Sequence, residues 1–208
     1  KITGTPATPG VYLVTVTVKD NDQLLATTDV IWTINPPPTL TPVNQMTAVG
    51  TLVSMAPLLS GGTAPLAWTA TGLPTGLSIN AGTGLITGRP VAGDVGRTMT
   101  VRLTVTDHYR LTSEVQFTWQ IVPALTITTA ATQTSTVGSP VNLTTNSVTG
   151  GSGAYTWAAT GLPPGLTLNA ATGAVTGIPT TRAVYPVVIT VTDTIGSSAS
   201  VTVVWTVA

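Results

Sequence analysis

The side chains of this sequence that could bind or react gather near three short polar turns. These turns read DNDQ from Asp20, DHYR from Asp107 and DTIGS from Asp193. A carboxylate in such a place can accept hydrogen bonds from backbone N–H groups of the turn that follows. We therefore expect Asp20, Asp107 and Asp193 to cap their own turns.

The same carboxylates are the candidates for a metal site. Asp20, Asn21 and Asp22 offer clustered oxygen atoms, and Asp107 is a further candidate. Calcium takes about six to eight oxygen ligands, and the turn at Asp193 supplies few of them. We expect no cofactor, and calcium at Asp20, Asp22 or Asp107 is the alternative.

A second group of candidate residues, His108, Tyr109 and Arg110, follows Asp107 in the middle turn. Loops on a rigid scaffold often carry binding residues. A planar Tyr beside an Arg that can form two parallel hydrogen bonds could grip a sugar or a protein. The other interpretation is an ordinary solvated loop, and the sequence leaves both open.

The residues required for catalysis are almost missing from the sequence. It contains one His, no Cys, and seven Asp and Glu residues in total. General acid–base or nucleophilic chemistry needs such groups close together, and the acidic residues are scattered along the chain. We expect that the protein is not an enzyme.

Charge and hydropathy exclude two further classes of protein. Charged residues make up 7% of the chain and the net charge is zero, so the basic surface that binds nucleic acid is missing. A polybasic membrane anchor is missing for the same reason. No apolar run approaches the roughly 20 residues of a membrane-spanning helix.

A long internal repeat defines the domain organisation. TATGLPTGLSINAGTGLITGRP at 69–90 returns as AATGLPPGLTLNAATGAVTGIP at 158–179, with a period of about 87 residues along the chain. The first 36 residues match only the later part of the repeated unit, at a constant spacing of 173 positions. We expect two complete domains, 37–123 and 124–208, and one truncated at its N-terminus, 1–36.

Within each unit apolar residues alternate with polar ones, which predicts half-buried β-strands. Val101, Leu103 and Val105 share one face of such a strand, and Phe117 and Trp119 share a face of the next. Short polar turns join these strands as antiparallel hairpins. We expect an all-β fold in which all five tryptophans pack in hydrophobic cores.

The repeated stretch itself reads as a chain reversal. Asn80 can accept hydrogen bonds from the backbone two residues further on, and Gly84 can adopt a positive φ. The second copy places Asn169 and Gly173 at the same points. No ligand is needed to explain the motif.

The pattern GLP-x-GL-x-[IL]-N-x-x-TG-x-[IV]-TG-x-P, followed by a strand that ends in TVTD, supports a family resemblance. It resembles the immunoglobulin-like domains of bacterial surface and secreted proteins, which are related to dystroglycan-type cadherin-like domains. The resemblance implies tandem β-sandwiches at the cell surface or outside the cell. It also implies a structural module such as a stalk, fibre or surface-layer segment. An adhesin or a sugar-binding appendage of a secreted enzyme is the alternative.

The partners expected from this interpretation are neighbouring domains of a longer chain or other copies of the protein, with a glycan or protein ligand as a further candidate. Residues 1–36 carry two long strands but lack the strands that should cover them. A lone hairpin is marginal in water. We expect the covering strands to precede these residues in the same polypeptide, and a second subunit is the alternative source.

Overall fold

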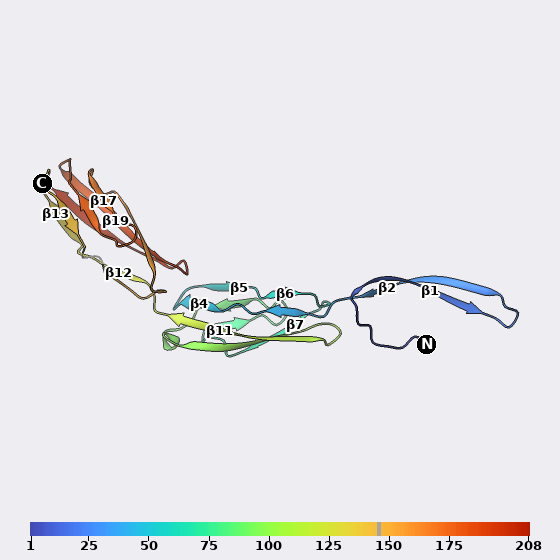
Figure 1. The fold of residues 1–208 in the computed structure, drawn as a ribbon. Helices are drawn as coiled ribbons and strands as arrows, with labels where there is room; N and C mark the ends of the chain where they lie inside the picture. Colours follow the sequence, from blue (N-terminus) through green and yellow to red (C-terminus); the bar gives the residue numbers. More distant parts are fainter. Residues whose placement is uncertain (145–146) are drawn as a thin grey trace.

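The computed structural model describes residues 1–144 and 147–208. Within these ranges the chain forms β-strands and one short 3-10 helix, η1 (Ala92–Asp94). Figure 1 shows three parts that follow one another along an elongated molecule: an N-terminal hairpin, a middle unit and a C-terminal unit. The expected all-β fold is confirmed.

The middle unit is a sandwich of two layers. One layer has the strand order β4-β11-β10-β7, in which β4 lies parallel to β11 and the other pairs are antiparallel. The other layer contains the sheet β5-β9-β8 and the pair β3-β6. The strands are β3 (Thr39–Thr41), β4 (Gln45–Ala48), β5 (Val53–Met55), β6 (Leu58–Ser60), β7 (Ala67–Thr71), β8 (Leu77–Ile79), β9 (Ile86–Gly88), β10 (Thr98–Thr106) and β11 (Thr112–Val122).

The C-terminal unit repeats this topology. Its layers are β13-β20-β19-β16, with β13 parallel to β20, and β14-β18-β17 together with β12-β15. The strands are β12 (Thr126–Thr128), β13 (Thr132–Ser135), β14 (Val141–Leu143), β15 (Ser147–Thr149), β16 (Tyr155–Thr160), β17 (Leu166–Leu168), β18 (Val175–Gly177), β19 (Ala183–Asp193) and β20 (Ser198–Val207).

Each unit has a hydrophobic core of its own between its layers, and the predicted inward faces are confirmed in both. In β10 the side chains of Val101, Leu103 and Val105 are buried, whereas that of Arg102 is exposed. Four tryptophans lie in the two cores with at most 5% of their surface exposed: Trp68, Trp119, Trp157 and Trp205.

The chain reversal in the repeated stretch also forms as predicted. The Asn80 side-chain oxygen accepts hydrogen bonds from the N–H groups of Gly82 and Thr83, and Gly84 has a φ of +74°. A Cβ atom on Gly84 would lie 2.6 Å from the ring of Trp68, so the glycine also makes room for the core tryptophan. Sequence reasoning identified the need for a positive φ and missed this contact.

The N-terminal hairpin consists of β1 (Gly10–Lys19) and β2 (Leu25–Ile34), which pair antiparallel. Its strands are long and regular, but within the described residues no second layer covers them. Trp32 is 43% exposed for this reason. Within residues 1–208 the expectation that all five tryptophans pack in cores therefore holds for four of them, and Trp32 lies on a face that no described residue covers.

Candidate functional site

The carboxylate of Asp107 joins two chain segments at one end of the middle unit, its own turn and the loop that contains Thr63. One oxygen atom, Oδ1, accepts hydrogen bonds from the N–H groups of Tyr109 and Leu111, both at 2.9 Å. The other, Oδ2, accepts one from Thr63, in the loop between β6 and β7, at 3.2 Å. The side chain is buried, so both oxygens are committed to backbone donors.

Asp193 repeats this arrangement in the C-terminal unit. Its Oδ1 accepts hydrogen bonds from Ile195 and Ser197, and its Oδ2 accepts one from Ser152. In the N-terminal hairpin the Oδ1 of Asp20 accepts from the N–H groups at positions 22 and 24. The expected capping role of these three carboxylates is confirmed.

The residues considered for calcium do not form a cluster of acidic ligands. Asp22 is exposed at the hairpin tip, and it contributes its backbone N–H to Asp20. Asp107 lies in another part of the molecule, beside the base of the hairpin. Among the residues that the structure describes, no three His, Cys, Asp or Glu side chains group closely enough to hold a metal ion.

The linkers between the parts are bound into the unit that follows. Pro36 precedes the middle unit, and its carbonyl accepts a hydrogen bond from Gly62 at 2.9 Å. Pro123 precedes the C-terminal unit and accepts one from Gly151 at 2.9 Å. Both glycines have a positive φ. Sequence reasoning missed this contact, although a Gly-Gly pair stands at the same place in both units.

The three residues predicted to bind a ligand lie at the junction between the N-terminal hairpin and the middle unit. The rings of His108 and Tyr109 meet edge to face, with centroids 5.0 Å apart. The backbone N–H of His108 donates to the carbonyl of Thr63, and that of Arg110 donates to the carbonyl of Asp107. The rings of His108 and Tyr109 are therefore in contact, whereas the backbone of Arg110 adopts a left-handed conformation with a φ of +63°.

A cleft of about 540 Å³ opens beside this loop. Its lining includes Tyr109 and Leu111 from the middle unit and Trp32, Ile34 and Asn35 from the hairpin. His108 and Arg110 do not line it. Of the three predicted binding residues only Tyr109, which is 65% exposed, faces the cleft.

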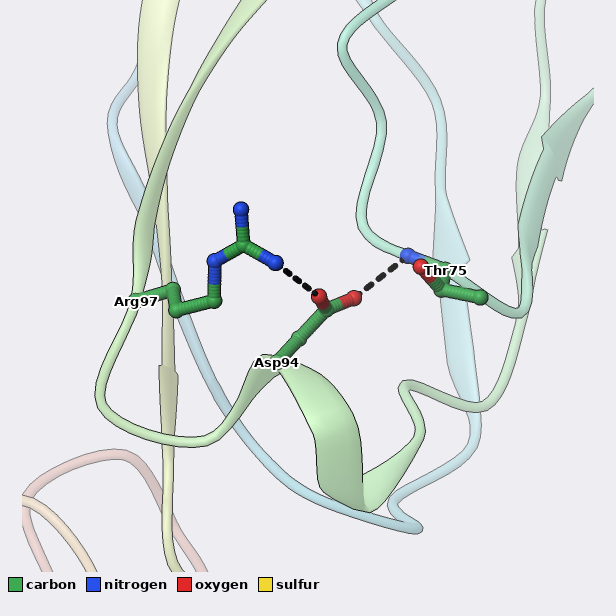
Figure 2. A network of polar contacts seen from close by, with 3 residues as sticks. All are labelled: Thr75, Asp94 and Arg97. Carbon is green, nitrogen blue, oxygen red and sulfur yellow. Dashed lines mark hydrogen bonds and ion pairs between the residues drawn. The ribbon is translucent and has the colours of Figure 1, made fainter.

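One polar network distinguishes the middle unit from its C-terminal copy. The buried carboxylate of Asp94, in η1, accepts a hydrogen bond from the N–H of Thr75 at 2.7 Å and pairs with Arg97 at 3.4 Å (Figure 2). In the C-terminal unit Pro164 replaces Thr75, and proline has no N–H group to satisfy. The network therefore satisfies a backbone N–H group that the middle unit has at this position and the C-terminal unit lacks.

Two β-sandwiches with one strand order, arranged in tandem and joined by short proline linkers, define an immunoglobulin-like array. The chain matches the family described as "Putative Ig domain" over residues 36–122 and again over residues 123–208. The protein belongs to this family.

The sequence relatives include a surface adhesin. The chain is 34% identical over 170 residues to the "Serine-rich adhesin for platelets" of Staphylococcus aureus strains MSSA476 and MW2. The match covers 79% of this chain and 7% of the adhesin. The tandem units are therefore related to a short part of a much longer staphylococcal protein.

The solved structures that match this chain include a fragment of titin and a bacterial protein. The I67–I69 fragment of titin is 10% identical, with a TM-score of 0.46 over 83% of this chain and 66% of the fragment. A "putative alpha-galactosidase/melibiase" from Bacteroides fragilis NCTC 9343 is 20% identical, with a TM-score of 0.36 over 40% of this chain and 17% of that one.

None of the helical structure in residues 1–144 and 147–208 is long and apolar enough to cross a bilayer.

Proposed function

We propose that this chain is a non-catalytic structural module, such as a stalk, fibre or surface-layer segment, of a larger bacterial surface or secreted protein. The observation that carries the proposal is the construction of the junctions. At Pro36 and at Pro123 the linker carbonyl accepts a hydrogen bond from a glycine of the next unit. The residue after that glycine donates its N–H to a buried Asp, which thereby joins this loop to the turn between the last two strands of the unit. Such anchoring limits rotation between neighbouring units.

The relatives support an extracellular place for the module. The matched part of the staphylococcal adhesin is a small fraction of that protein, as expected for a repeated spacer. A surface of hydroxyl and apolar side chains with 7% charged residues also suits a module that stands beside neighbouring domains. No cofactor is part of the proposal, because the oxygens of Asp107 and Asp193 already accept backbone hydrogen bonds.

Two measurements test this function. Antibodies raised against the chain should label intact cells of the bacterium that carries the gene, and labelling only after permeabilisation would contradict the proposal.

Small-angle X-ray scattering should show a particle whose maximum dimension is that of units arranged end to end. The variant Gly151→Ala should broaden the distribution of distances, because a Cβ at this positive φ would lie 2.6 Å from the Asp193 carboxylate and disturb the hydrogen bond to Pro123 at the second junction. Gly138→Ala, at a positive-φ turn with open space around its Cβ position, is the matched control.

A second candidate function is recognition of a glycan or protein by His108, Tyr109 and Arg110. The exposed ring of Tyr109 favours it, since an aromatic ring on a loop of a rigid scaffold can stack against a sugar. A glycan array and a polysaccharide pull-down test this directly. Binding that Tyr109→Ala abolishes would support recognition. Ile195→Ala, at the equivalent tip of the C-terminal unit, is the control and should leave binding unchanged.

A further inference from the structure

The N-terminal hairpin and the C-terminal hairpin are built to the same register. In β1 and β2 the pairing runs from Gly10 opposite Ile34 to Lys19 opposite Leu25. In β19 and β20 the residues 173 positions later pair in the same way, from Ala183 opposite Val207 to Thr192 opposite Ser198. The two hairpins therefore present equivalent residues on equivalent faces.

These equivalent faces differ in burial. Val16 and Trp32 are 41% and 43% exposed, whereas their counterparts Ile189 and Trp205 are 0% and 1% exposed. In the C-terminal unit the covering residues come from β12 to β18, which we call the front half of the unit. The inner face of the N-terminal hairpin thus has the shape and apolar character of a core surface without its cover.

Two polar groups of the N-terminal hairpin show the same difference. The indole N–H of Trp205 donates to Ser135 in the front half, at 3.0 Å. The Oδ2 of Asp193 accepts from Ser152, also in the front half. Within the described residues, the indole N–H of Trp32 and the Oδ2 of Asp20 have no such partner, although Asp20 keeps both bonds to its own turn.

Gly4 provides an independent sign of the same missing contact. Its φ of +153° is close to the +133° of Gly177, the equivalent residue in β18. A Cβ atom on Gly177 would collide with the carbonyl of Gly165, across the pair β17-β18, whereas one on Gly4 would meet open space. Gly4 therefore has the backbone conformation that Gly177 adopts where a neighbouring strand lies against it.

We propose that the inner face of β1 and β2 is an interaction surface for the front half of a third immunoglobulin-like unit, supplied by the polypeptide immediately before Lys1. The occupant would resemble residues 124–173, which carry no charged side chain and bury their apolar residues on β19 and β20. The inner face of β1 and β2 is likewise uncharged, so the two surfaces are compatible.

The structure favours this source over a second copy of the chain. Both front halves of these 208 residues are already sealed on their own hairpins, since Ile86 and Val175 at their centres are 0% exposed. A second copy would have to unfold a unit to offer its front half. The segment ITGTP from Ile2 also matches VTGIP from Val175, the last strand of a front half, so the covering strands would join the hairpin without a linker.

The test adds the expected covering strands to the chain and measures how fast single introduced cysteines react with a thiol reagent. The chain has no cysteine of its own, so each introduced thiol gives an unambiguous signal. Residues 124–173 are duplicated in front of Lys1, which restores the spacing of the repeat. Val16→Cys reports the N-terminal hairpin, and Ile189→Cys reports the equivalent buried position of the C-terminal unit. Thiol-labelling rates are measured in the 208-residue chain and in the extended chain, and light scattering gives the mass of each.

We expect Val16→Cys to react rapidly in the monomeric 208-residue chain. In the extended chain the labelling rate should be at least about 100-fold lower, because a buried thiol reacts only when its unit unfolds. An extended chain in which Leu166→Asp is placed in the duplicated segment alone should lose this protection. If Ile189→Cys stays protected while Val16→Cys stays reactive in the extended chain, the proposal is overturned. Protection of Val16→Cys in a dimer of the 208-residue chain would overturn the upstream source.

The natural gene provides a second measurement. The codons immediately before Lys1 should encode a Trp-containing strand and then the pattern GLP-x-GL-x-[IL]-N-x-x-TG. Natural protein whose preceding residues lack this pattern would contradict the proposal.

Discussion

The N-terminal hairpin and the C-terminal hairpin pair in the same register, yet one is open and the other is sealed. Even a local detail repeats: the hydroxyl of Tyr12 donates to Thr8 and that of Tyr185 donates to Thr181, both at 3.0 Å. The comparison separates two contributions to stability. The strand pattern and the turn set the pairing, whereas strands distant in sequence provide the burial that stabilises it.

The largest difference is expected for the tryptophans. Trp205→Ala should lower the free energy of unfolding of the C-terminal unit by about 3–5 kcal/mol, because it leaves a large cavity in a closed core. Trp119→Ala should have a similar effect on the middle unit alone. Trp32→Ala should change the stability of the chain by less than about 0.5 kcal/mol.

Denaturant unfolding followed by circular dichroism measures these three variants. Equal losses for Trp32→Ala and Trp205→Ala would show that the N-terminal hairpin has a closed core of its own. An unchanged stability in Trp119→Ala would show that the inward face assigned to β11 does not stabilise the middle unit.

A smaller contrast is expected for two equivalent glycines. Gly177→Ala should destabilise the C-terminal unit by about 2–3 kcal/mol, because the new Cβ meets the Gly165 carbonyl at a positive φ. Gly4→Ala should have an effect below about 1 kcal/mol, since its Cβ position is open. Thermal unfolding of both variants gives the comparison, and a larger loss in Gly4→Ala would contradict it.

A still smaller contrast in stability is expected for the carboxylates that cap the turns. Asp193→Ala removes an acceptor from three N–H groups at a buried position, and we expect a loss of about 1.5–3 kcal/mol. Asp20→Ala removes two hydrogen bonds at an exposed turn, with a loss below about 1 kcal/mol. Chemical denaturation of the two variants checks this order, and a larger loss in Asp20→Ala would contradict the stabilising effect assigned to burial and to the Ser152 hydrogen bond.

No effect is expected from removal of metal ions. The carboxylates at the junctions bind backbone N–H groups, so the melting temperature should coincide within error with and without a chelator. Differential scanning calorimetry in calcium and in EDTA tests this. A decrease of several degrees in EDTA would restore calcium at Asp20, Asp22 or Asp107.

Much of the fold could be predicted from the sequence because its signals are local. Alternation of Val101, Leu103 and Val105 gives the face of a strand, and the repeat transfers each assignment from one unit to the other. The turn at Asn80 and the hydrogen bonds from Asp107 and Asp193 to their own turns depend on groups within a few residues. Such features need no knowledge of distant contacts.

The contacts that sequence reasoning missed join segments that are far apart in the chain. Gly84 lies against Trp68, and Thr75 requires Asp94 because it has an N–H group that Pro164 lacks. The cleft beside Tyr109 depends on the placement of the N-terminal hairpin, which no periodicity encodes. For this reason the sequence correctly assigned His108, Tyr109 and Arg110 to a loop, but it could not show that only Tyr109 of the three lines the cleft.

Hydrogen exchange measured by mass spectrometry on the 208-residue chain compares the two hairpins most directly. Residues 10–34 and 183–207 form the same ladder of backbone pairs, so a difference in exchange reports the cover and not the pairing. The account predicts that amides of β1 and β2 exchange at least about 100-fold faster than those of β19 and β20. Equal protection of the two hairpins in a monomer would contradict it.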